Sequence, residues 1–484
     1  MKTGSFIGID FGTTNTSVVS ILKDEHGEKI NIIGEKGEPF ASLFAVYPDN
    51  KANFGNIVKK NRDSLAESCT IISSFKSLLG TDKSITLNNK DFTPVKIVSE
   101  YLRCLKIYVK KIYNIDISEA SFSFPVDFTP EARRDLRKAA QIAKIKVTGM
   151  ISESTAAYLA TCEKLKGLSR VMVIDWGGGT LDISILEVTE QKVREISVYG
   201  EKIGGDDIDK ELAERIHSQF NLKLSDPDMR IPFRNMPAPQ RDKMLSSCER
   251  AKIQISEDGE DYPLTIRNYG DYGTKTINVS NEMFEDVVKP IIRNKALKSI
   301  DKAMERAGLS KSNIDAVVIA GGSSNLRQFA DAVINLFGED KIILPDNAQF
   351  VSAKGAALVP FIGGNFKLND DIGIVMSDNT VFPILKKDVD GVGSISDTYT
   401  FSLVEDSPDA HFIITNGDGR IVYDKVNVPT KGFLNERLEV SAYIDDEQVV
   451  NVKIHSSAVA DEMKDKVAKI SQVTYYYDLS EIDS

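Results

Sequence analysis

The sequence predicts an α/β protein with two similar lobes, followed by a small antiparallel β-domain. A turn motif rich in glycine and hydroxyls occurs twice, at residues 7–17 and 173–182. Residues 1–200 alternate short apolar strands with helical segments, which is typical of an α/β layer architecture. After residue 372 the pattern changes to alternating strands separated by tight turns, which favours an antiparallel sheet.

Each copy of the turn motif follows an apolar strand that ends in an aspartate. The first copy reads IGIDFGTTNTS and contains Asp10, and the second reads VIDWGGGTLD and contains Asp175. Glycines let backbone N–H groups approach an anion closely, and hydroxyls add further donors. Two such turns facing each other predict a clamp for a polyphosphate, with the two aspartates left to manage its magnesium ion.

Length and composition set the class of protein. A chain of 484 residues with 42% apolar residues predicts a globular protein of about two to four domains. The net charge of −11 argues against a mainly nucleic-acid or anionic-membrane role, because its sign is wrong for either partner. Residues 1–5 lead directly into the first motif, and no apolar run approaches the roughly 20 residues needed to cross a bilayer. We therefore expect a cytoplasmic protein that does not enter membranes.

The helices and strands of the first part follow from periodicity and capping. The second helix opens with Thr129-Pro130-Glu131, which gives it a hydroxyl cap and a proline in its first turn. A continuous apolar run predicts a buried strand that ends at the glycine turn 321–324. The expected order is helix 95–113, helix 129–142, a mostly helical stretch 205–256 with a Pro-rich break at 231–239, strands 262–268 and 275–279, a long helix 281–307, and strand 315–320.

The predicted β-domain begins after Gly363-Gly364. Turn pairs such as Asn416-Gly417 and Asp418-Gly419 separate its alternating segments up to about residue 455. The stretch 462–484 is short and polar, and we expect no long helical bundle there. The predicted organisation is a nucleotide-binding region 1–364, a linker 365–371 and a β-domain 372–484.

Other common catalytic and metal-binding patterns are absent from the sequence. It contains no G-x-x-x-x-G-K-[ST] motif, which excludes a P-loop. Four cysteines lie far apart without a C-x-x-C pair, so we expect reduced thiols. The four histidines are isolated, and we expect surface or loop positions for all of them, namely His26, His217, His411 and His455.

The duplicated motif resembles that of the actin, sugar-kinase and heat-shock ATPase superfamily. Seven further segments, in family order, resemble the DnaK-type heat shock protein 70 (Hsp70) chaperones in particular. They are 75–80, 124–133, 153–157, 204–209, 248–252, 321–323 and 354–357. The resemblance implies two actin-like (ribonuclease H-like) ATPase lobes followed by an antiparallel β-sandwich that binds peptide, here without a helical lid.

The resemblance also implies roles for individual residues. Asp10 and Asp175 would hold Mg²⁺ through water, and Lys76 and Glu153 would orient the attacking water at the γ-phosphate of ATP, with Thr180 completing the catalytic set. This set suits phosphoryl transfer, which needs mainly positioning and charge neutralisation. The residues implied in nucleotide binding are Gly12, Thr13, Thr14, Asn15, Gly177, Gly178, Gly179, Gly204, Gly205, Glu249, Lys252, Ser256, Gly321, Gly322 and Ser323.

The sequence departs from the family pattern at several of these places. Two arginines that sandwich adenine in the family are Ile253 and Asn325 here, which predicts weaker ATP binding. Ser154 replaces the proline next to Glu153, and the polar linker 365–371 replaces an apolar one. An arginine used for docking J-domain proteins is Gly149, whereas three relay-like residues are kept, namely Pro125, Arg133 and Arg137.

The resemblance and the departures from it leave three candidate functions. The leading one is a slow ATPase and chaperone that binds extended apolar peptide, with unfolded polypeptide, a J-domain co-chaperone and a nucleotide exchange factor as implied partners. The alternative is a regulatory nucleotide-binding partner of another chaperone with little or no turnover. A small-molecule kinase is disfavoured, because its C-terminal region is usually helix-rich. Candidates for a peptide pocket are Phe401, Ser402, Phe412 and Ile414, although ordinary sandwich core is the favoured explanation for these four residues.

Overall fold

The structure is a computed structural model that describes residues 4–24, 27–49, 51–65, 68–87, 90–224, 226, 229–456 and 465–480. The chain divides into two compact units. The first contains residues 1–189 and 195–362, and the second contains residues 190–194 and 363–484. None of the described helices is long and apolar enough to cross a membrane. His26 lies outside the described residues.

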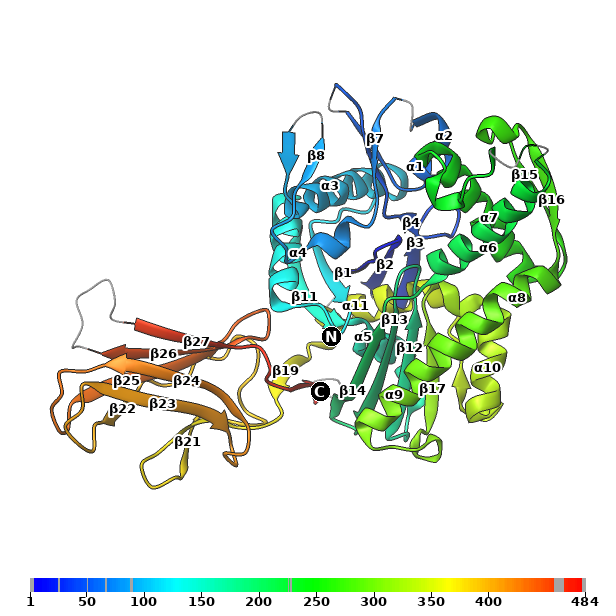
Figure 1. Ribbon diagram of the computed structural model, residues 1–484. Coiled ribbons are helices and arrows are strands. Elements are labelled where there is room, and N and C mark those ends of the chain that lie inside the picture. Colours follow the sequence, from blue (N-terminus) through cyan, green and yellow to red (C-terminus); the bar gives the residue numbers. More distant parts are fainter. Residues whose placement is uncertain are drawn as a thin grey trace. The chain divides into compact units, whose positions relative to one another are not determined.

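The first unit is built on two sheets with the same strand arrangement. The first sheet has the order β11-β10-β1-β2-β3, and the second contains the run β18-β17-β12-β13-β14 (Figure 1). In each sheet a central antiparallel hairpin lies next to a parallel strand. This arrangement agrees with the duplication predicted from the two turn motifs. The bounds are β1 Gly4–Phe11, β2 Asn15–Asp24, β3 Gly27–Ile33, β10 Glu119–Phe124, β11 Lys146–Ser152, β12 Arg170–Trp176, β13 Leu181–Val188, β14 Lys192–Glu201, β17 Ala316–Ala320 and β18 Ile342–Ile343.

Helices cover these sheets where the sequence is amphipathic. Thr129 caps α4 by accepting a hydrogen bond from the backbone N–H of Ala132 at 3.2 Å, as the sequence predicts. Helices α5 and α11 pack together, and α11 also packs on β1 and β10. The bounds are α1 Asn56–Lys60, α2 Arg62–Leu65, α3 Pro94–Tyr113, α4 Pro130–Ile142, α5 Glu153–Thr161, α6 Gly205–Leu222, α7 Ala238–Asp258, α8 Asn281–Ile291, α9 Leu297–Ala307, α10 Arg327–Phe337 and α11 Val351–Ile362.

Smaller sheets complete the first unit. The hairpin β15–β16 packs against α7, which in turn packs against α6 (Figure 1). The helix predicted at 281–307 consists of α8 and α9 joined by a π-helical turn at Ile292–Ala296. The remaining strands are β4 Phe40–Ala41, β5 Phe44–Val46, β6 Ala52–Phe54, β7 Thr70–Ile72, β8 Ile85–Leu87, β9 Lys90–Phe92, β15 Tyr262–Ile266 and β16 Lys275–Val279.

The second unit contains two four-stranded antiparallel sheets, β21-β20-β23-β24 and β22-β25-β26-β27. Buried side chains of both sheets form one hydrophobic core, which includes Ile374, Ile414, Val440 and Val452. The bounds are β19 Asn365–Leu368, β20 Ile372–Val375, β21 Val381–Leu385, β22 Tyr399–Ser402, β23 Asp409–Asn416, β24 Val422–Pro429, β25 Arg437–Ile444, β26 Val450–Ser456, β27 Asp465–Ile470 and β28 Tyr475–Asp478.

The C-terminal part of this unit corrects the sequence prediction. The described part of the polar C-terminal stretch, residues 465–480, contains two strands, β27 and β28, which the sequence did not single out. The predicted linker also contains a strand, β19, which pairs antiparallel with β28 over four residues. Phe366 packs edge-to-face on Tyr477, and Lys367 forms an ion pair of 2.6 Å with Asp478. A polar linker is therefore ordered here by a partner strand more than a hundred residues away in the sequence.

One of the described histidines is buried, and the cysteines are unpaired. The expectation of surface or loop positions is wrong for His217, which lies on α6 with only 1% of its surface exposed. Its Nδ1 meets the Tyr269 hydroxyl and its Nε2 meets the Ile231 carbonyl, both at 2.8 Å. His411 and His455 lie on strands β23 and β26. All four cysteines are free thiols, as predicted.

Candidate nucleotide-binding site

The two glycine turns lie against each other in the first unit. The first turn connects β1 to β2 and carries Thr13 and Thr14, and the second connects β12 to β13. A Cβ atom on Gly178 would collide with the Thr14 side chain, so only glycine permits this approach. The two turn motifs, whose aspartates Asp10 and Asp175 are 165 positions apart, thus lie against each other, as the sequence predicts.

Two further glycine segments pack on the second turn. At the start of α6, the backbone N–H groups of Gly205 and Asp206 donate to the carbonyls of Gly177 and Gly178, at 3.1 and 2.8 Å. The Ser323 hydroxyl donates to the Gly177 carbonyl at 2.7 Å. Gly321 has a φ of 84°, and a Cβ atom on it would collide with an Asp175 carboxylate oxygen. All four glycine segments named from the sequence therefore meet at one place.

Buried carboxylates line the base of these turns. Burial, followed by the charge of Glu153, raises the pKa of Asp10 to about 7. Burial and the charges of Glu153 and Asp10 likewise raise the pKa of Asp175. One carboxylate oxygen of Asp10, Oδ1, is buried and has no hydrogen-bond partner among the described residues. Repelling acids with an unpartnered oxygen suit a bound cation, so the residues present fit the magnesium ion that the sequence implies.

Asp182 belongs to this acidic group and was not singled out from the sequence. It lies on β13 directly opposite Asp175 in the antiparallel register. Burial, then the charges of Glu153 and Asp127, raises the pKa of Asp182 to about 7. The sequence feature that could have identified Asp182 is its position at the end of the second turn motif.

The only cation close to these acids in the described hydrogen-bond network is Lys76. Its Nζ lies 3.3 Å from Glu153 Oε1, and both side chains are nearly fully buried. Lys76 belongs to a 3₁₀ turn, Phe75–Leu78, and its Nζ lies 5.6 Å from the centre of the Phe128 ring. Glu153 is the first residue of α5. The structure therefore joins two residues that are 77 positions apart and were both predicted to be catalytic.

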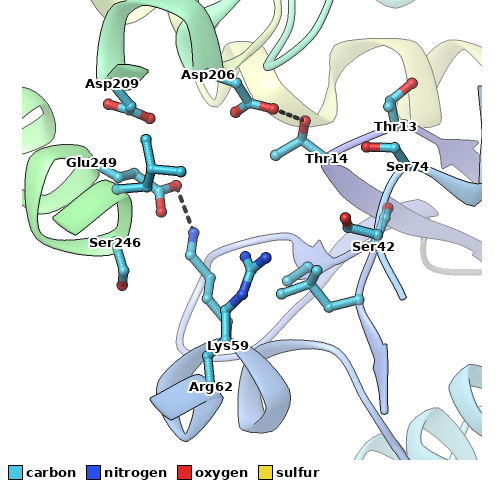
Figure 2. A pocket seen from close by; sticks show the side chains of 14 residues that line it. Thr13, Thr14, Ser42, Lys59, Arg62, Ser74, Asp206, Asp209, Ser246 and Glu249 are labelled. Carbon is cyan, nitrogen blue, oxygen red and sulfur yellow. Dashed lines mark hydrogen bonds and ion pairs between the residues drawn. The ribbon is translucent and has the colours of Figure 1, made fainter. Parts of the chain in front are cut away.

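A cavity of ≈ 220 Å³ opens beside the first turn (Figure 2). Hydroxyl groups of Thr13, Ser42 and Ser74 lie on one side of it, and carboxylates of Asp206, Asp209 and Glu249 lie on the other (Figure 2). This polarity suits a ligand that carries both phosphate and hydroxyl groups. Asp206 accepts a hydrogen bond from Thr14 at 3.1 Å across the cavity.

Two basic residues that the sequence did not single out also line the cavity. Lys59 forms an ion pair of 2.7 Å with Glu249, and Arg62 forms one of 3.0 Å with Asp242. Glu249, expected at the ribose and adenine edge, thus already has a protein partner. Lys59 and Arg62 occur in a polar run without periodicity, so no local signal marked them.

Lys252 and Ser256 also bond to protein groups. Lys252 Nζ lies 2.7 Å from Asp209 Oδ2 and 2.9 Å from the Gly205 carbonyl oxygen. Burial opposes the charge of Lys252, but the surrounding carboxylates raise its pKa. Ser256 donates to the Lys252 carbonyl at 2.6 Å. Ile253 is 46% exposed on the same helix, and Asn325 is exposed at the end of a short 3₁₀ turn.

The two sheets with the same strand arrangement and the paired glycine turns fit an α/β protein of the actin-like ATPase fold. The family model of the Hsp70 protein matches residues 6–384. The chain belongs to the Hsp70 family. Members of this family are ATP-binding chaperones and generally ATPases. The match covers the first unit from residue 6 onward and ends within β21, so most of the second unit lies beyond it.

Proposed function

We propose that this protein binds Mg-ATP in the cleft of its first unit and hydrolyses it slowly. The observation that carries this proposal is the contact among the four glycine segments, with the buried acids and the Lys76–Glu153 pair close to the turns and a cavity beside the first turn. Backbone N–H groups and hydroxyls of the two turns would hold the phosphates. Lys76 and Glu153 would orient the attacking water, with Thr180 near the phosphate oxygens. A magnesium ion held through water by Asp10 and Asp175 would neutralise phosphate charge.

The contacts of Glu249, Lys252 and Ser256 modify the expected base site. These three residues bond to protein groups, so nucleotide must exchange for these contacts or bind beside them. The exposed Ile253 supports weak contact with the base, because it offers apolar surface but no guanidinium for stacking. ATP affinity is therefore proposed to be lower than the family norm.

We further propose that the second unit binds extended apolar peptide, and this part rests on family membership. Phe412 and Ile414 belong to the hydrophobic core of the unit, with 6% and 0% exposure. Phe401 is half-buried and packs edge-to-face on Phe412, and Ser402 is exposed. Only Phe401 and Ser402 are therefore accessible to peptide without a rearrangement of the core.

The alternative function, a regulatory nucleotide-binding partner of another chaperone, is favoured by one specific observation. The linker strand β19 is paired with β28, which supports weak communication of the nucleotide state through this segment. Peptide release would then change only a few-fold between ATP and ADP, which corresponds to about 1 kcal/mol of coupling or less.

Single-turnover hydrolysis of ATP, with and without a J-domain protein and an unfolded peptide, separates the two functions. Measurable turnover that peptide accelerates supports the chaperone. Tight nucleotide binding without turnover supports the regulatory partner. Stopped-flow release of a fluorescent apolar peptide measures the coupling, and a hundred-fold acceleration by ATP would contradict the weak-coupling proposal.

A further inference from the structure

One carboxylate oxygen accepts hydrogen bonds from three hydroxyl groups at the start of helix α5. Glu195 Oε1, on strand β14, accepts hydrogen bonds from Ser154 Oγ at 2.6 Å and Thr155 Oγ1 at 3.0 Å. It also accepts a short hydrogen bond from Ser152 Oγ. These three donors surround Glu153 in the sequence, so a residue some 40 positions away holds the whole first turn of the helix.

The hydroxyls themselves form a closed, buried group. Ser152 is the N-cap of α5, and its Oγ accepts a hydrogen bond from the Thr155 backbone N–H at 3.2 Å. Its hydroxyl also lies 2.9 Å from Thr155 Oγ1. Ser152, Ser154 and Thr155 are all buried. Buried hydroxyls need partners, so loss of the Glu195 carboxylate would leave them to rearrange. A negative charge at a helix N-terminus is also favourable, because the helix dipole is positive there.

Glu153 needs this support because its surroundings repel it. Asp10, Asp175 and Asp182 all experience its negative charge, and Lys76 Nζ lies 3.3 Å from its Oε1. The Glu153 side chain can therefore keep one orientation only if its backbone is fixed. Small displacements of a group that orients a reacting water are costly, since about 1 Å can change a rate by about 100-fold.

We propose that Glu195 is a positioning residue that fixes the first turn of α5 and thereby the carboxylate of Glu153. The role rests on the proposed function of Glu153 in ATP hydrolysis. Glu195 acts through Ser152, Ser154 and Thr155, and it does not touch the nucleotide cavity. Its removal should therefore affect the hydrolysis step and leave nucleotide binding intact.

Three single variants test this role in the full-length protein. Glu195→Ala removes all three hydrogen bonds and should lower kcat about ten-fold with an unchanged Kd for ATP. Glu195→Gln keeps an acceptor oxygen and should stay within about three-fold of the parent. Glu201→Ala is the matched control, because Glu201 lies on the same strand but bonds to Tyr199 and Lys295. Equal kcat values for Glu195→Ala and Glu201→Ala would overturn the proposal.

A double variant distinguishes a positioning role of Glu195 from general destabilisation of the protein. Proline at position 154 is compatible with the first turn of α5 and fixes φ there, because the first N–H groups of a helix have no partner within the helix. Ser154→Pro combined with Glu195→Ala should recover most of the lost kcat. A recovered melting temperature without recovered kcat would contradict the positioning role.

A crystal structure of Glu195→Ala supplies a readout that does not depend on ATP hydrolysis. The proposal expects the Glu153 carboxylate to move away from Lys76. An unmoved Glu153–Lys76 pair would overturn it, even if the parent protein proves inactive. Absence of turnover in the parent would instead count against the proposed function alone.

Discussion

Lys59 and Glu249 are joined across the cavity by an ion pair of 2.7 Å between Nζ and Oε1 (Figure 2). Lys59 lies on α1 and Glu249 lies on α7, 190 positions away in the sequence. The pair is partly exposed, with 35% and 23% of the two side chains accessible. It therefore links the two sides of the cavity by an interaction of modest strength.

Loss of this pair should speed nucleotide release. An exposed pair contributes about 0.5–1 kcal/mol, so Lys59→Ala should raise the dissociation rate of ATP about two- to five-fold. Lys60→Ala is the control, since Lys60 lies on the same helix but pairs with Glu35. Stopped-flow displacement of a fluorescent ATP analogue measures both rates. Identical rates in the two variants would show that the pair does not hold the cavity closed.

Removal of the Lys76 amine should separate binding from hydrolysis. Lys76→Ala should lower the hydrolysis rate by about 100-fold or more, because it deletes a charge close to the reacting phosphate. Nucleotide affinity should change little, because the glycine turns and hydroxyls remain. Single-turnover hydrolysis and equilibrium binding are measured on the same preparation. A variant that hydrolyses ATP like the parent would show that the assigned geometry is wrong.

An arginine at position 253 should strengthen ATP binding. Ile253 is exposed, so Ile253→Arg does not disturb the core, and stacking on the base should add about 0.5–2 kcal/mol. Gln254→Arg, at the adjacent exposed position, controls for the added positive charge. Isothermal titration calorimetry measures the affinity of both variants for ATP. Equal affinities of the two variants would mean that residue 253 does not face the base.

The pairing of the linker strand with β28 should protect the linker from proteolysis. Tyr477→Ala removes the ring that packs on Phe366, and deletion of a buried aromatic ring costs about 3–5 kcal/mol. Trypsin should then cleave after Lys367 much faster. Tyr443→Ala, at a partly exposed position on β25, is the control. Unchanged cleavage in Tyr477→Ala would indicate that β19 is protected by other contacts.

Protonation of His217 should destabilise the fold at acidic pH. Its Nε2 faces a carbonyl and must donate, so its Nδ1 accepts from the Tyr269 hydroxyl and the ring is neutral. Burial lowers the pKa of His217, although the hydrogen bond to Ile231 opposes this effect. The unfolded chain therefore binds this proton first, and stability is lost as pH falls below about 6.5.

Replacement of His217 by a residue that does not titrate isolates the contribution of His217 to the pH dependence of the unfolding free energy. His217→Gln keeps a donor and an acceptor, so the difference in unfolding free energy between pH 7.5 and pH 5.5 should be smaller in the variant than in the parent. Urea unfolding at both pH values measures it. An equal pH dependence would show that other groups cause the acid sensitivity.

Local sequence patterns were sufficient for much of the fold. The glycine turns, the capping residue Thr129 and the buried strand at 316–320 depend on backbone conformation and periodicity within a few residues. The same patterns failed at residues 465–478, because short polar or tyrosine-rich strands carry no clear alternation until a partner strand is known. They also failed at His217, whose burial depends on a distant tyrosine and carbonyl.

The sequence by itself determined the duplicated glycine turn, the glycines that permit the close approach of its two copies, and the acids and Lys76 that lie beside it. The tertiary structure alone decided that Lys59 meets Glu249, that Lys252 bonds to Asp209, that Glu195 holds the first turn of α5, and that β28 pairs with the linker. The reason is physical. A turn is encoded by the conformational limits of adjacent residues, whereas an ion pair or a strand pair between distant segments exists only after the core has brought those segments together.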